Sequence, residues 1–146
     1  AGENRYTYSR PTKDKTAEFF EVCKSLADYV FLDCASSLDD PLSVYGMAAA
    51  DKAVQLVTPD IRSAAYYASF EKTYEQIKSK SIGVINITDK DLYLPVGEVK
   101  AGFSNAKYIL PYSMYLKQQY ITGELTHKIP DQKFSAVCRG IAGAVL

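Results

Sequence analysis

The chain has 146 residues, of which 47% are hydrophobic and 23% charged, and these proportions are ordinary for a folded globular domain. Lys plus Arg and Asp plus Glu both total 17, so the formal net charge of zero excludes a general basic footprint for nucleic acid, although a local patch and therefore DNA stay open. No apolar run approaches the ~20 residues of a membrane-spanning helix, and the first residues have no hydrophobic signal core, so we expect a cytoplasmic protein with no membrane span.

The cysteines and the single histidine do not form a metal-binding pattern. Cys23, Cys34 and Cys138 stand far apart, and none belongs to a CxxC pair. An odd, unpatterned set of cysteines in a reducing cytosol indicates buried free thiols and not a zinc site. His127 has no cysteine or histidine at metal-ligand spacing, so we expect it at the surface.

The first part of the chain predicts two helices and one strand. Residues 1–11 are polar and aromatic and are expected to form an edge strand or a loop. Residues 12–27 carry apolar side chains at helical spacing. The unbroken apolar run 29–32 indicates a strand covered on both faces, as in a parallel sheet. A short helix then starts at Asp40, the expected N-cap, with Pro41 at the first helical position.

The rest of the chain alternates apolar runs with helical patterns. Strands are predicted at 53–58, 81–86 and 107–110. Helices are predicted at about 61–79, near 96–103, near 113–121 and at 132–145. The longest of these helices carries a stripe made of Tyr67, Phe70, Tyr74 and Ile77. At three- and four-residue spacing such a stripe indicates core packing more than a groove for a partner.

Alternating strands and helices predict the α/β class. Successive parallel strands need right-handed crossovers, which place helices on the faces of the sheet. The chain has no internal repeats and no low-complexity linker, so we expect one α/β unit over residues 1–146.

Each predicted strand is followed by a polar or turn-forming residue, and ligands of open parallel sheets bind beyond the carboxyl ends of the strands. These residues are Asp33 after the first strand, Pro59 and Asp60 after the second, Asn86 after the third, and Pro111 with Tyr112 after the fourth. A carboxylate such as Asp33 can hold Mg²⁺ through water, because Mg²⁺ prefers hard oxygen ligands and retains part of its hydration shell. The alternative for Asp33 taken alone is a helix cap or a satisfied turn.

The order of these segments resembles that of the ParA/MinD family of P-loop ATPases. Residues 28–33 (DYVFLD) are similar to the family's Walker B strand, which ends in an Asp that serves the magnesium. Residues 50–63 resemble its apolar strand and Thr-Pro-(Asp/Glu) turn before a long helix, and residues 84–86 resemble its strand ending in Asn. Residues 109–112 are similar to a strand that runs into a proline-containing turn, and residues 120–123 to the glycine-containing loop after the next helix.

The resemblance covers roughly residues 25–146, and within the family the TadZ/CpaE branch of pilus-positioning ATPases is a good fit. It implies a Rossmann-like, three-layer, P-loop NTPase-like domain that binds ATP and Mg²⁺ and dimerises with ATP to position a cargo. By resemblance, Asp33 serves the magnesium, Asn86 contacts the adenine, and Pro111 with Tyr112 lines the base pocket. The implied partners are a second copy of the protein, in a homodimer, and a protein of a positioning or secretion machinery.

One part of the family's site has no counterpart in this sequence. The family holds phosphates with a glycine-rich loop that carries lysine and Ser or Thr, and no glycine here precedes a Lys-Thr or Lys-Ser pair. We therefore expect a half-domain that lacks the phosphate-loop strand, binds no ATP tightly by itself and is inactive alone. The loop would come from an N-terminal segment of a longer polypeptide, whose ATPase activity stays open because residues 34–37 also depart from the family's Pro-Ala-Gly-like switch.

Two other functions stay open. A non-catalytic adaptor would keep the fold for dimerisation or localisation and bind a protein partner without ATP turnover, and the departure after Asp33 favours it. A receiver domain or another small doubly wound module ranks last. A receiver needs a cluster of acidic residues near its first strand, whereas residues 1–11 supply only Glu3.

Overall fold

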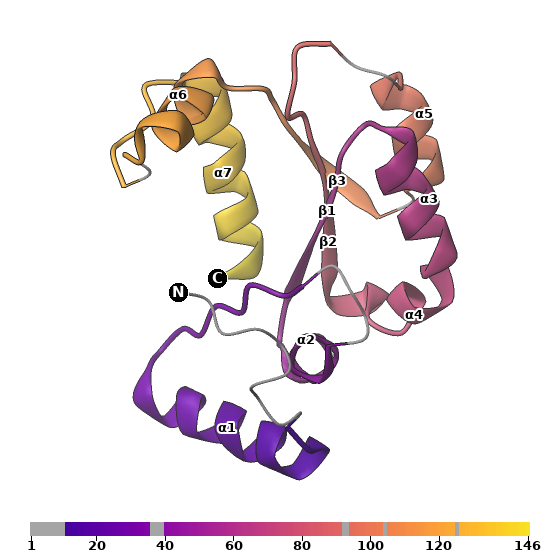
Figure 1. Cartoon of the computed structure of the whole chain (residues 1–146), viewed down its shortest axis with the longest axis vertical. Helices are drawn as coiled ribbons and strands as arrows, with labels where there is room; N and C mark the ends of the chain where they lie inside the picture. Colours follow the sequence, from indigo (N-terminus) through magenta and orange to yellow (C-terminus); the bar gives the residue numbers. More distant parts are fainter. Residues whose placement is uncertain (1–10, 36–39, 92–93, 104, 125) are drawn as a thin grey trace. The chain divides into compact units, whose positions relative to one another are not determined.

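A computed structural model describes residues 11–35, 40–91, 94–103, 105–124 and 126–146. The chain divides into two compact units, Ala1–Asp51 (unit 1) and Lys52–Leu146 (unit 2), and each is described by itself. Both are drawn in Figure 1. The sequence predicted a single α/β unit over residues 1–146, and this stays a prediction. Within the described part of the chain, no helix is long and apolar enough to span a membrane.

Unit 1 contains the two helices predicted for it, α1 (Lys13–Leu26) and α2 (Pro41–Ala49). Asp40 caps α2, since its carboxylate accepts a hydrogen bond from the Ser43 N–H at 2.8 Å, and Pro41 stands at the start of the helix as predicted. The two helices approach each other at a glycine. A Cβ atom at Gly46 would lie 3.0 Å from the Leu32 side chain and 3.4 Å from the Phe20 ring, so the glycine permits a close approach at this point.

The strand predicted for residues 29–32 is wrong. Residues 27–35 form neither helix nor strand, and the three-stranded sheet of the structure includes none of them. A β-strand needs a neighbour to pair its backbone N–H and C=O groups, and this segment has none among the described residues. Its side chains remain exposed instead, by 62% at Tyr29 and 81% at Phe31.

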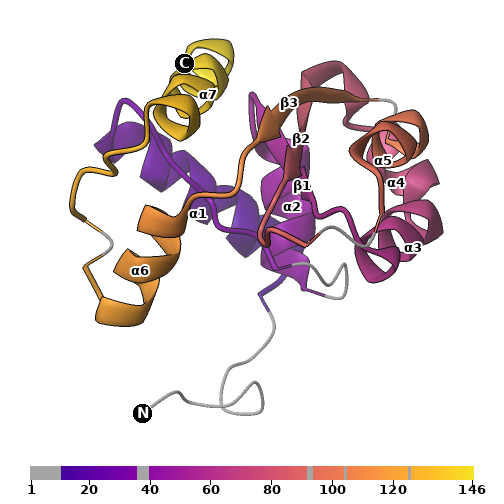
Figure 2. The same cartoon turned by 90° about the horizontal axis from the view of Figure 1, so that it is seen from above.

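Unit 2 is built on a parallel sheet of β1 (Ala53–Val57), β2 (Ser81–Asn86) and β3 (Ala106–Leu110), in the order β1-β2-β3. All three strands were predicted, and the α/β class with a parallel sheet is confirmed. Helices lie on both faces, with α3 and α5 on one side and α7 on the other (Figure 1). Figure 2 shows the same arrangement from above. The central strand β2 is the most buried because it has a neighbour on each side.

The helices of unit 2 are α3 (Ile61–Ser69), α4 (Glu71–Glu75), α5 (Val96–Gly102), α6 (Met114–Thr122) and α7 (Gln132–Val145), with a 3₁₀ turn at Lys78–Lys80. The single helix predicted over 61–79 is wrong, because it breaks at Phe70, where φ is −115° and ψ is 14°. The Phe70 N–H bonds to the Tyr67 carbonyl three residues back, which ends α3. The break accompanies aromatic packing, in which the Tyr67 and Tyr74 rings stack at 5.4 Å.

The main hydrophobic core lies between the sheet and α3 with α5. It is formed by the buried residues Val57, Ile85, Val99 and Phe103. Tyr67 packs against this cluster, with its ring edge-on to Phe103 at 4.7 Å, so this member of the aromatic stripe contributes to the core as predicted. On the opposite face, the Tyr108 hydroxyl of β3 donates a hydrogen bond to the Gly140 carbonyl of α7 at 2.9 Å. This bond holds α7 against the edge of the sheet.

Candidate functional site

The carboxyl ends of β2 and β3 bring three of the predicted site residues to one edge of the sheet. Asn86 ends β2 and lies in register with Leu110, the last residue of β3. The N–H of Ile87 donates to the Leu110 carbonyl at 2.9 Å, so the two chains stay paired beyond the strands. Pro111 and Tyr112 follow Leu110 directly. Asn86, Pro111 and Tyr112 are each half-buried, so part of each residue stays accessible to solvent.

A charged loop lies beside Tyr112. The Lys90 amine, from the segment after β2, lies 6.0 Å from the centre of the Tyr112 ring. At that distance a cation–π attraction is at its outer limit, and an exposed one contributes about 0.5–1 kcal/mol. The loop after β2 therefore places a positive charge next to the aromatic ring.

The polar residues after β1 are used within the protein. The Asp60 carboxylate accepts hydrogen bonds from the Thr58 hydroxyl and from the Ser63 N–H, the latter at 2.8 Å. The Thr58 N–H donates in turn to the Ser63 hydroxyl at 3.0 Å. These bonds, that of Thr58 foremost, lower the pKa of Asp60, so the carboxylate is ionised at neutral pH and caps α3. It is held in place as a helix cap and is not turned toward an open site.

Asp33 belongs to unit 1 and is described only with that unit. It is exposed and does not follow a strand, because the strand predicted before it is not formed. The neighbouring thiol of Cys34 has a raised pKa, chiefly through burial and further through the negative charge of Asp33. No group of three or more His, Cys, Asp or Glu side chains that could hold a metal ion occurs among the described residues. The magnesium role of Asp33 stays a prediction.

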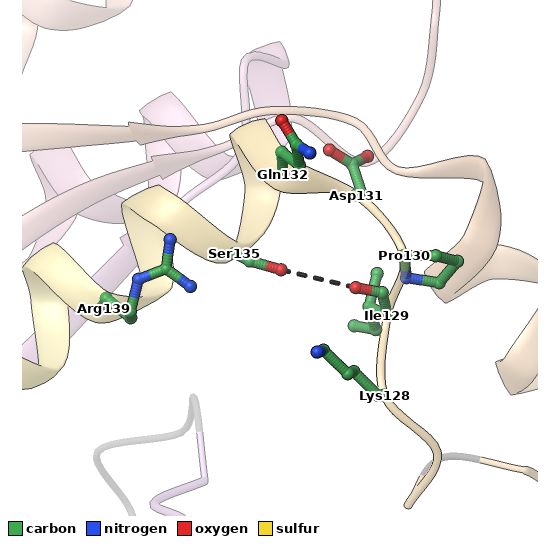
Figure 3. A pocket seen from close by; sticks show the side chains of 7 residues that line it. All are labelled: Lys128, Ile129, Pro130, Asp131, Gln132, Ser135 and Arg139. Atoms are coloured by element: carbon green, nitrogen blue, oxygen red, sulfur yellow. Dashed lines mark hydrogen bonds between the residues drawn. The ribbon is translucent and has the colours of Figure 1, made fainter.

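A second feature was missed by the sequence analysis. A cavity of about 480 Å³ is lined by Lys128, Ile129, Pro130, Asp131, Gln132, Ser135 and Arg139 (Figure 3). It is formed by the loop before α7 and the first turns of that helix. The loop is fixed to α6, because the Gln119 side-chain amide donates to the His127 carbonyl at 3.1 Å. Two basic residues on either side of a Pro-Asp helix start were the only sequence signal for it.

Asp131 occupies the rim of this cavity. Its carboxylate accepts a hydrogen bond from the Phe134 N–H at 3.0 Å and caps α7. That bond is the main cause of a lowered pKa for Asp131. The Ser113 hydroxyl lies close enough to lower the pKa further, although it does not reach the geometry of a formed hydrogen bond. Ser113, in the turn that follows β3, therefore lies near the rim of the cavity.

No family model matches the chain, and no curated protein and no solved structure is significantly similar to it. Its function must therefore be argued from its own residues and their placement.

Proposed function

We propose that the chain is the carboxyl-terminal part of a ParA/MinD-type nucleotide-binding domain and forms the base-binding side of its site. In this proposal Asn86 contacts the adenine, and Pro111 with Tyr112 lines the base pocket. The observation that carries it is the register of β2 and β3, which sets Asn86 beside the start of the Pro111–Tyr112 turn at the carboxyl edge of a parallel sheet. That edge is where ligands of open α/β sheets bind.

The residue types at this edge suit a purine base. An amide side chain both donates and accepts hydrogen bonds, which matches the mixed donors and acceptors on the edge of an adenine ring. A tyrosine ring offers a flat surface for stacking, and base–aromatic stacking contributes about 1–3 kcal/mol. Since Asn86 and Tyr112 are half-buried, a ligand can reach them without displacing core packing.

The phosphate side of the site is supplied from elsewhere in this proposal. No glycine of the sequence precedes a Lys-Thr or Lys-Ser pair, so a further segment of a longer polypeptide would provide the phosphate loop. β1 is an edge strand of the described sheet, and its Val54 and Leu56 side chains are exposed. An uncharged edge strand invites pairing with another strand, and a strand leading into the phosphate loop would satisfy this need. Asp33 would serve Mg²⁺ in the intact parent.

Binding to the chain as it stands should be weak and dominated by the base. We expect adenosine and ATP to bind with similar dissociation constants, on the order of 1 mM, which corresponds to about −4 kcal/mol. Amide resonances of Asn86 and residues 111–112 should move in an adenosine titration followed by NMR. Tyr112→Ala should weaken binding at least about fivefold through the lost stacking. Tyr115→Ala serves as the matched control, because Tyr115 is an exposed tyrosine on α6.

The outcome that would contradict the proposal is specific. If adenosine and ATP at several millimolar leave the resonances of Asn86 and Tyr112 in place, the base pocket does not exist. Equal losses in Tyr112→Ala and Tyr115→Ala would have the same meaning. Intact mass of the natural protein then decides whether a lysine-containing phosphate loop belongs to the same polypeptide, in which case ATP with Mg²⁺ should bind far more tightly and drive homodimerisation.

A non-catalytic adaptor is the second candidate. It is favoured by the strand-end carboxylate Asp60, which is fully engaged as a helix cap, and by Asp33, which follows no strand. An adaptor would use the fold to bind a second copy of the chain or a protein of a positioning machinery, and it would not bind ATP. A protein that dimerises equally with and without ATP-Mg²⁺ in light-scattering measurements fits the adaptor and not the ATPase.

A further inference from the structure

Two cationic side chains face the same cavity in unit 2. Lys128 enters from the loop before α7, and Arg139 from the second turn of the helix; Figure 3 shows both side chains extending into the space beside Ser135. Ser135 and Arg139 are four residues apart and therefore share one face of α7. Among the described residues, the Ser135 hydroxyl makes one long hydrogen bond, which it donates to the Ile129 carbonyl at 3.4 Å.

The positive charge in this cavity is not balanced within the described part of the chain. Neither Lys128 nor Arg139 forms a salt bridge with any described carboxylate. Asp131 is the only acidic residue in the lining, and its carboxylate is bound to the Phe134 N–H at the start of α7. Figure 3 shows that carboxylate turned away from Lys128 and Arg139. The cavity thus combines two cations and a hydroxyl, and its one acidic lining residue is engaged as the cap of α7.

The size and walls of the cavity indicate the kind of ligand. The hollow is open to solvent, since Lys128, Pro130, Gln132 and Arg139 are exposed. Its volume of about 480 Å³ exceeds what a bare inorganic ion fills and leaves room for a small organic anion bound at the surface. Ile129 and Pro130 add an apolar wall. Arginine recognises phosphate and carboxylate groups through paired, charge-assisted hydrogen bonds, and lysine adds a point charge.

We infer that this cavity binds a small organic anion, with its phosphate or carboxylate group between Lys128 and Arg139 and its apolar body against Ile129 and Pro130. The site is separate from the proposed base pocket at Asn86 and Tyr112, so either can fail without the other. The shared chemistry is an oxyanion on a compact apolar group.

Phenyl phosphate and benzoate are suitable probes, with phenol as the neutral counterpart. Each is titrated into the whole chain at physiological salt and followed by ¹H–¹⁵N NMR. We expect at least one of the two anions to move the resonances of residues 128–139 in a saturable manner while phenol leaves them unchanged. The tighter of the two distinguishes a phosphorylated natural ligand from a carboxylate. Resonances of Asn86 and Tyr112 should stay in place, which separates this result from a test of the base pocket.

Charge-matched variants make the test specific. Lys128→Gln with Arg139→Gln should lower the affinity for the better anion at least tenfold, since two charge-assisted hydrogen bonds are lost. Lys117→Gln with Arg62→Gln removes the same charge from exposed positions outside the cavity and should leave the affinity within about twofold.

Two results would overturn the inference. One is the absence of saturable shifts in residues 128–139 when either anion is added to about 10 mM, a concentration about ten times the dissociation constant of a weak, millimolar site. The other is an equal loss of affinity in both pairs of variants, which would show a general response to net charge. Mapping the wild-type resonances decides the question even where a variant does not fold.

Discussion

Two segments predicted as strands, residues 29–32 in unit 1 and β2 in unit 2, have different structures. Residues 29–32 (YVFL) are an unbroken apolar run, which predicts a strand buried on two faces, whereas β2 (SIGVIN) carries Ile82, Val84 and Ile85 among Ser, Gly and Asn. β2 forms a strand, pairs with β1 and β3, and buries Val84 and Ile85 completely. Residues 29–32 form no strand and expose Phe31. An apolar run therefore specifies a strand only where other segments supply paired backbone groups on its flanks.

The largest expected difference in stability between the two regions follows from removing one aromatic ring from each. Phe103→Ala leaves a cavity in the core of unit 2, where Phe103 contacts Tyr67, and should lower the free energy of unfolding by about 3–5 kcal/mol. Phe31→Ala removes an exposed ring and should change it by less than about 0.5 kcal/mol. Urea unfolding followed by circular dichroism measures both.

A large cost for Phe31→Ala would break the comparison. It would mean that residues 29–32 are buried in solution, and therefore that a strand partner covers them there. The proposed longer polypeptide, in which the phosphate-loop strand lies beside the strand of Asp33, would then gain support. A small cost leaves the segment as an exposed apolar surface.

Local signals in the sequence predicted the starts of helices in both units. Asp40 and Asp60 each start a helix, and each accepts a hydrogen bond from a serine N–H three residues later at 2.8 Å. Such a cap is decided by neighbouring residues alone, so a sequence reader can find it. The break at Phe70 was missed. It accompanies the stacking of Tyr67 on Tyr74, and both residues also fit the spacing of a continuous helix, so the sequence pattern does not reveal it.

The two candidate sites also differ in how far the sequence alone could predict them. The edge formed by Asn86 and Tyr112 could be placed from the order of strands, since parallel strands align their carboxyl ends. The cavity between Lys128 and Arg139 could not, because its shape depends on how the loop is fixed to α6 by Gln119. That contact has no periodic signature in the sequence.

A smaller effect is expected at the point where β2 meets the segment before β3. A Cβ atom at Gly83 would lie 2.4 Å from the Asn105 carbonyl oxygen, a backbone atom that cannot turn aside. Gly83→Ala should therefore lower the free energy of unfolding by about 1–3 kcal/mol. The control is Gly97→Ala in α5, where the added atom meets open space and should raise stability by up to about 1 kcal/mol.

These glycine variants sharpen the comparison because they test strand pairing directly. If Gly83→Ala is neutral in thermal and urea unfolding while Gly97→Ala is stabilising, the close approach between β2 and Asn105 is not maintained in solution. The close approach of Asn105 to Gly83 would then not explain why β2 forms a strand and residues 29–32 do not.

The smallest effect is expected at the matched helix caps. Asp60→Ala and Asp40→Ala each remove the acceptor for a serine N–H and should each cost about 0.5–2 kcal/mol. The pKa of Asp60 is lowered in the folded protein below its unfolded value of about 3.9. Its contribution is therefore fully present above about pH 5 and is lost as the pH falls through the folded pKa.

Unfolding of the wild type and of Asp60→Asn between neutral pH and about pH 3 measures this contribution. The wild type should lose more stability on acidification than the variant, because the variant has no carboxylate to protonate at that position. Parallel pH profiles would show that the bonds from Thr58 and Ser63 do not favour the ionised form. The cap would then depend on geometry alone, and the predicted start of a helix at residue 61 would rest on the proline and the helix pattern and not on charge.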